Sequence, residues 1–195
     1  MTEIKELSID QQFLEKVALT IGGEVTANRV ANFLQQASQK GLLFRGIKSK
    51  KRSEQSINEG VLPVAPEGGK LASWWAFGPY IFAYPSSMTQ GMFGFDTPFF
   101  HYGHWKDNDT QGFSLAITSK NTVANHGYIE HTGQAQLTVP LDPQLVQFIQ
   151  IERPLTSPAE LSRTTGQALE QKAFELMEKI AEEGPKFGTV IRVTI

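Results

Sequence analysis

The chain has 195 residues, of which 40% are hydrophobic and 19% are charged, and its 18 basic and 20 acidic side chains give a formal net charge of −2. This composition is typical of a globular protein and excludes collagen-like and disordered chains, and it gives no general attraction to nucleic acid. The lack of cysteine excludes disulfides, thiolate zinc sites and a cysteine nucleophile. No apolar run approaches the ~18 residues of a membrane helix, and the first residues lack the order of a secretion signal. We therefore expect a cytoplasmic protein without a membrane partner.

The first 41 residues are predicted to be helical. Ser8 and Gln11 have the spacing of a capping box, and the apolar side chains that follow repeat with helical spacing until Gly22. A second helix is predicted after Thr26, a good capping residue, and it ends at Gly41, where a left-handed residue belongs.

The middle of the chain is predicted to consist mainly of strands. Residues 42–47 form a short apolar run that favours a buried strand, and its one charge, Arg45, needs a partner. A short helix that ends at Gly60 follows this strand. Three later segments have the pattern of strands: 113–118, the alternating run 134–139, and 146–151.

A late helix completes the predicted order. Ser157, Pro158 and Glu160 form a capping signature, and the apolar helical face after it ends at Gly184. Residues 190–195 suit a closing strand. Helices near both ends with strands between them indicate an α+β fold with a split, mixed sheet. We expect a single domain over 1–195, with a helical part at 1–41 and a β-rich core that carries the late helix at 42–195.

Aromatic residues are concentrated in one segment. Residues 71–105 hold 12 of the 20 aromatic side chains, and the only formal charge among them is Asp96. Such a segment is either buried core or the lining of a ligand site.

Three motifs follow one another in residues 42–83. They are Leu-Leu-Phe-Arg-Gly-Ile at 42–47, Ile-Asn-Glu-Gly-Val at 57–61, and Gly-Pro-Tyr-Ile-Phe-Ala at 78–83. Their order and spacing resemble the NAD-binding core of the ADP-ribosyltransferase superfamily, over roughly residues 42–152. In that family, a strand that ends in Arg-Gly or His-Gly precedes a helix with a Glu-Gly-Leu-like end. A glycine-aromatic strand then covers the nicotinamide, and 78–83 resembles it, with proline at the second glycine.

The resemblance implies that the protein binds NAD as a substrate and transfers ADP-ribose to an acceptor that the sequence does not specify. Arg45 would anchor the phosphate or ribose through its planar fork, and Gly46 would hold the carboxamide with its backbone. Tyr80 or Tyr84 would stack on the nicotinamide ring.

The family glutamate is the main departure. The family usually has Glu-x-Glu at the start of a later strand, where a carboxylate balances the oxocarbenium-like charge of the transition state. This chain has Gln134-Ala135-Gln136 at the matching place. A glutamine amide can bind a ribose hydroxyl but carries no charge. Gln136 and the nearby Glu130 are therefore the candidate catalytic residues, and an inactive nucleotide-binding module of the same fold is the alternative.

Histidines offer another chemistry. His101 and His104, with Asp107 and Asp109, have side chains that bind metals, and His126 or His131 would complete the set. The second alternative is therefore a histidine-ligated, metal-dependent enzyme on a β-rich scaffold. The NAD hypothesis, in contrast, expects no metal.

A basic run follows the first strand. Five of the 18 cations, namely Arg45, Lys48, Lys50, Lys51 and Arg52, lie within eight residues. The run is either a solvated loop or a source of attraction for the phosphates of NAD or of RNA. Aromatic side chains do not alternate with these cations, which argues against a dedicated nucleic-acid surface without excluding nucleic acid as a partner.

Overall fold

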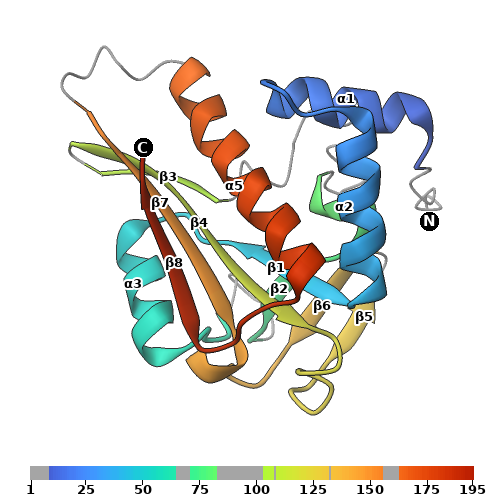
Figure 1. Cartoon of the computed structure of the whole chain (residues 1–195). Helices are drawn as coiled ribbons and strands as arrows, with labels where there is room; N and C mark the ends of the chain where they lie inside the picture. Colours follow the sequence, from blue (N-terminus) through green and yellow to red (C-terminus); the bar gives the residue numbers. More distant parts are fainter. Residues whose placement is uncertain (1–8, 65–70, 83–102, 108, 132, 156–162) are drawn as a thin grey trace, which may run out of the picture.

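The computed structural model describes residues 9–64, 71–82, 103–107, 109–131, 133–155 and 163–195. In this part of the chain, an eight-stranded mixed sheet has helices on both faces (Figure 1). The main path of the sheet is β5-β6-β2-β1-β4-β7-β8, and β3 pairs with β4. The β7–β8 pair is parallel and the other pairs are antiparallel. The predicted α+β class, with N-terminal helices and a late helix, is confirmed.

The helices are α1 (Gln11–Ile21), α2 (Ala27–Gln39), α3 (Lys50–Glu59) and α5 (Arg163–Glu183), with short 3-10 helices η1 (Gly78–Ile81) and η3 (Pro143–Leu145). The strands are β1 (Leu42–Gly46), β2 (Ser73–Ala76), β3 (His104–Lys106), β4 (Thr110–Ser119), β5 (Ile129–His131), β6 (Gln134–Leu137), β7 (Gln147–Pro154) and β8 (Thr189–Thr194). Among the described residues, no helix combines the length and apolar character that crossing a bilayer requires.

Local signals explain where the first helices begin and end. The Thr26 side chain accepts a hydrogen bond from the Arg29 amide at 3.2 Å, and Gly41 has φ +59°, so both predicted ends of α2 are confirmed. α1 begins instead after Asp10, whose carboxylate accepts from the Phe13 amide at 2.8 Å. Ser8 and residues 157–160 lie outside the described residues.

One face of the sheet packs against α1, α2 and α5, as Figure 1 shows. Phe33 of α2 lies at the centre of this core. Its ring meets the rings of Phe44, Phe82 and Phe174 edge to face, at centroid distances of 5.8, 5.6 and 5.6 Å. These contacts join β1, the end of η1 and α5, and such pairs add about 0.5–1.5 kcal/mol each beyond the burial of their area.

The opposite face carries α3 and a smaller core. This core contains Leu43 of β1, Trp75 of β2 and Phe148 of β7, and Ile57 of α3 packs against it. Side chains that alternate along a strand point to opposite faces, so Arg45 lies on the same face as Leu43, which is the face of α3.

Residues 78–81 form a 3-10 helix, so the predicted glycine-aromatic strand is wrong. Gly78 has φ +61°, and Pro79 occupies the first turn. Proline cannot donate a hydrogen bond to a sheet, and its fixed φ suits the start of a helix. The turn buries the Tyr80 side chain beside β2 instead of extending it along a strand.

Candidate functional site

The sheet opens between β1 and β2. These strands share one registered pair, Phe44 opposite Ala76, whereas β1 pairs with β4 along five residues. Where the two strands diverge, the Arg45 guanidinium of β1 donates through Nη1 to the Trp74 carbonyl of β2 at 2.9 Å. A cleft of about 860 Å³ lies at this opening, bounded by β1, α3, residues 60–64, β2 and η1.

The cleft has cationic and apolar walls. Arg45, Lys48 and Arg52 provide its charges, and Leu62, Val64 and other apolar side chains provide much of the remaining surface. Among the described residues that line the cleft, none is acidic. An aromatic and apolar wall beside cations suits a ligand that has a flat group and a negatively charged group.

Arg45 is the most unusual of these cations. Its side chain is half-buried, and burial, together with the positive charge of Arg52, lowers its pKa to about 10. The guanidinium is therefore still charged at neutral pH. In the described part of the chain, no carboxylate forms an ion pair with it. Partial burial of this cation carries a desolvation cost that a bound anion would offset, which makes Arg45 a candidate anion-binding residue.

The basic run is divided by the geometry of α3. Ser49 caps this helix by accepting a hydrogen bond from the Arg52 amide at 3.0 Å. Lys48 and Arg52 then reach the cleft, whereas Lys50 pairs with Glu152 of β7 at 3.1 Å. Sequence reasoning treated these cations as one group, because it could not predict which sides of α3 face the cleft and the sheet.

Gly46 and Tyr80 also line the cleft. The Tyr80 side chain is buried and packs over Gly133, where a Cβ atom would overlap its ring. Gly133 has φ +71° in the turn between β5 and β6, and its carbonyl accepts a hydrogen bond from the Phe77 amide at 3.1 Å. Tyr84 lies outside the described residues.

Gln134 lines the cleft, whereas the candidate Gln136 does not. Gln134 is paired with Ala76 of β2, the residue that also pairs with Phe44 of β1, whereas Gln136 is paired with Trp74. The Gln136 side chain forms a hydrogen bond with the His131 ring, with 3.0 Å between Oε1 and Nε2. Sequence reasoning missed Gln134 as the cleft residue. The Gln-x-Gln pattern contains it, but only the register with β2 selects it.

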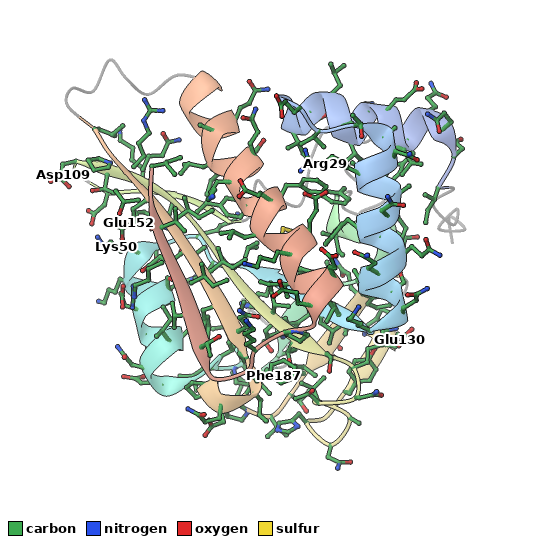
Figure 2. The ribbon with its side chains drawn as sticks, viewed as in Figure 1. Arg29, Lys50, Asp109, Glu130, Glu152 and Phe187 are labelled. Carbon is green, nitrogen blue, oxygen red and sulfur yellow. The ribbon has the colours of Figure 1, made fainter. Side chains whose placement is uncertain are left out.

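Glu130 does not reach the cleft. The chain turns at Gly133 between β5 and β6, and this turn places Glu130 opposite Ala135 on the edge strand β5. Figure 2 shows it at the end of the molecule far from Lys50, which begins α3. Its carboxylate accepts hydrogen bonds from Tyr128 Oη at 2.6 Å and Lys120 Nζ at 3.2 Å. These donors, Tyr128 first, lower the pKa of Glu130.

The described histidines have separate environments. His104 of β3 contacts Glu170 of α5 at 2.8 Å, and His131 packs on Trp74 with ring centroids 5.4 Å apart. Within the described ranges, no three histidine or acidic side chains form a group that could hold a metal ion. His101 lies outside these ranges.

Comparison of the chain with protein-family models, with curated proteins and with solved structures finds no match.

Proposed function

We propose that the cleft binds NAD or a related nucleotide that contains a pyrophosphate, and that the protein is a divergent member of the ADP-ribosyltransferase-like class. One observation carries the proposal: a half-buried arginine, with which no carboxylate of the described residues forms an ion pair, lies in a cleft whose described lining has no acidic residue. A phosphate oxygen would accept two N–H bonds from its planar fork and neutralise its charge.

The distribution of side chains supports a nucleotide rather than a simple anion. A volume of about 860 Å³ lies within the ~300–1,000 Å³ range of small-molecule sites. Arg45, Lys48 and Arg52 would meet the phosphates. Leu62 and Val64, which are 42% and 50% exposed, offer apolar contact to a flat base or to nicotinamide.

Binding without bond cleavage is the activity that this cleft supports best. Loss of nicotinamide builds positive charge on the ribose, and a carboxylate normally balances that charge. The described lining contains Gln134 and no carboxylate. The Gln134 amide can hold a ribose hydroxyl, so binding is retained while the transition state lacks its counter-charge.

ADP-ribose transfer is the second candidate function, and the observation that favours it is the position of Gln134. It is the first residue of the Gln-x-Gln pattern that matches the family's Glu-x-Glu, and it lines the same cleft as Arg45 and Gly46. Nicotinamide released from NAD by the wild-type protein would favour transfer over binding alone.

Calorimetric titration of the full chain with NAD and with ADP-ribose tests the proposal. We expect both to bind, and we expect Arg45→Met to raise Kd by about tenfold or more, since a charge-assisted hydrogen bond contributes about 1.5–3 kcal/mol. Arg153→Met is the matched control, because Arg153 lies on β7 outside the cleft lining. If wild-type protein binds neither compound, or if Arg153→Met weakens binding as much as Arg45→Met, the proposal is wrong.

A further inference from the structure

α3 is attached to the sheet mainly by polar side chains. Of its ten residues, only Ile57 is apolar, so burial of apolar area contributes little to holding the helix in place. Ser53 and Gln150 are nevertheless only 1% and 2% exposed, so the contact between α3 and β7 is closely packed. A polar contact of this kind is stable only when its buried groups have hydrogen-bond partners.

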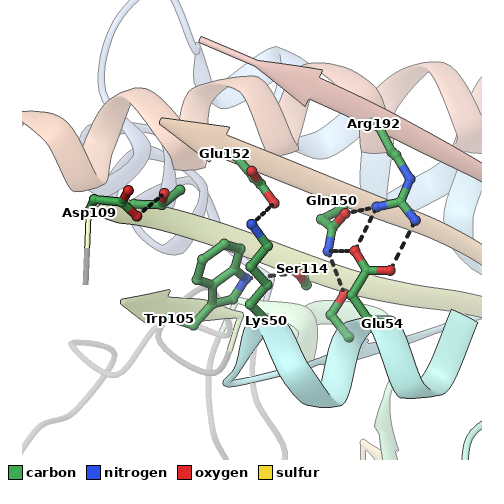
Figure 3. Close-up of polar contacts among 10 residues, drawn as sticks. Lys50, Glu54, Trp105, Asp109, Ser114, Gln150, Glu152 and Arg192 are labelled. Carbon is green, nitrogen blue, oxygen red and sulfur yellow. Dashed lines mark hydrogen bonds and ion pairs between the residues drawn. The ribbon is translucent and has the colours of Figure 1, made fainter. Parts of the chain in front are cut away.

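Besides the ion pair of Lys50 with Glu152, four side chains join α3 to the sheet, and we call them the α3 clamp: Ser53, Glu54, Gln150 and Arg192. The Gln150 amide donates to Glu54 Oε1 at 3.0 Å and to Ser53 Oγ at 3.4 Å, and its oxygen accepts from Arg192 Nη1 (Figure 3). The Arg192 guanidinium of β8 also donates hydrogen bonds to both Glu54 carboxylate oxygens, at 2.9 and 3.2 Å. The clamp therefore joins α3 to two neighbouring strands.

The positive charges in the first turn of α3 destabilise the N-terminal end of the helix, so this end depends on the clamp to hold it in place. The first turn contains Lys50, Lys51 and Arg52 and no acidic residue. The helix dipole places partial positive charge at the same end, where cations are unfavourable. Arg52 also faces the charge of Arg45 across the cleft, and this repulsion contributes to the lowered pKa of Arg45. An anion in the cleft would relieve both effects.

The clamp and the cleft lie on different sides of one short helix. Ser53 and Glu54 face the strands, whereas Arg52, Gln55 and Ser56 line the cleft. A ten-residue helix moves as a unit, so the contacts on one side set the position of the side chains on the other.

We propose that Glu54, Gln150 and Arg192 are positioning residues for the cleft: they hold α3 against its cationic repulsion so that Arg52 and Gln55 face the ligand. This inference rests on the proposed nucleotide function. By thermodynamic reciprocity, a nucleotide that binds beside α3 also stabilises the docking of α3 on the sheet.

Gln150→Leu tests the inference without changing any charge, and Gln147→Leu is its matched control. Gln147 lies on the same strand, is 3% exposed, and loses one hydrogen bond, from the Lys186 amide at 2.8 Å, without contacting α3. Both variants should lower Tm. Only Gln150→Leu should raise the Kd for NAD, by about fivefold, and reduce the hydrogen-exchange protection of α3. In the double variant Glu54→Arg with Arg192→Glu, the Kd for NAD should stay within about twofold of the wild-type value, because the two side chains re-form the ion pair with their positions reversed.

A second readout needs no nucleotide. Iodide and acrylamide both quench tryptophan fluorescence, but only iodide is attracted by the cleft cations. The ratio of iodide quenching to acrylamide quenching therefore reports the positive potential beside Trp74, which is 38% exposed. Gln150→Leu should lower this ratio and Gln147→Leu should not. If both variants have the same Kd and the same ratio as wild type, the inference is wrong. If wild-type protein binds no NAD, the nucleotide proposal fails, and the quenching ratio still decides whether the clamp positions the cations.

Discussion

Arg45 of β1 donates a hydrogen bond from Nη1 to the Trp74 carbonyl of β2 at 2.9 Å, across the place where the two strands part. One guanidinium thus bridges the opening of the sheet and supplies the half-buried charge of the cleft. The two roles contribute to stability with opposite signs, because the hydrogen bond stabilises the fold, whereas partial burial of a cation that has no ion-pair partner among the described residues destabilises it.

Arg45→Met should leave the free energy of unfolding within about 1 kcal/mol of the wild-type value, because an apolar side chain of similar length removes the buried charge together with its bond. Arg29→Met should cost more, about 1–2 kcal/mol, because it leaves Glu178 of the partly buried Arg29–Glu178 pair without its partner. Urea unfolding of both variants measures the difference. A loss larger for Arg45→Met than for Arg29→Met would show that Arg45 is mainly a structural residue.

Nucleotide affinity should fall as the pH rises through about 10. Burial lowers the pKa of Arg45 to about 10 in the free protein, and a bound anion stabilises its charged form. The gain in affinity from Arg45 is therefore fully present below the pKa of the free protein, and it is lost progressively as the pH rises from that value toward the higher pKa of the bound state. Calorimetry at pH 7.5 and 10.5 should find the ratio of Kd between Arg45→Met and wild type shrinking toward one at the higher pH. A constant ratio would contradict this electrostatic role.

Glu130→Gln should leave both the Kd for NAD and any nicotinamide release unchanged, because Glu130 is held by Tyr128 and Lys120 outside the cleft. The substitution should instead reduce the acid sensitivity of the fold. Glu130 has a lowered pKa in the folded state, so its stabilising contribution is present above its ordinary pKa of about 4.5 and is lost as the pH falls through the folded value. Unfolding at pH 6 and at pH 3 measures the effect. A large loss of NAD binding would place Glu130 in the site.

Gln134→Glu should raise the Kd for NAD several-fold, because a carboxylate opposes the phosphates, and should introduce slow release of nicotinamide. The new charge would stabilise the ribose cation that forms as the glycosidic bond breaks, and water would then add to C1′ to give ADP-ribose and a proton. Gln136→Glu, two residues along the same strand but outside the cleft lining, is the control and should release none. Chromatographic assay of nicotinamide distinguishes them. Unchanged NAD binding in Gln134→Glu would place Gln134 away from the bound nucleotide.

Gly133→Ala should destabilise the protein by about 2–4 kcal/mol, because the added Cβ would overlap the Tyr80 ring at a φ of +71°. Gly184→Ala separates backbone strain from this overlap. Gly184 has φ +88°, and beyond the adjacent backbone no heavy atom of the described residues lies within 4 Å of the added Cβ, so its loss should be about 1–2 kcal/mol. Thermal unfolding of the two variants gives the comparison, and equal losses would show that the contact with Tyr80 contributes nothing.

The sequence alone predicted those elements whose signals are local. Thr26 and Gly41 mark the ends of α2 because a cap depends on residues within one turn. The alternation over 134–139 predicted a half-buried strand because neighbouring side chains of a strand point to opposite faces, and residues 134–137 form β6. The strand predicted over 78–83 was wrong for residues 78–81 because it followed a resemblance between motifs, whereas Gly78 and Pro79 favour a turn.

The tertiary structure alone decided which side chains meet. Arg45 and Trp74 are 29 residues apart in the chain, and Arg192 lies 138 residues from Glu54. The choice of Gln134 over Gln136 follows from the register of β6 against β2, and the place of Glu130 outside the cleft follows from its pairing with Ala135 on the edge strand β5. Strand pairing and helix orientation depend on the burial of whole faces, and the sequence near a residue contains no record of which distant strand will lie beside it.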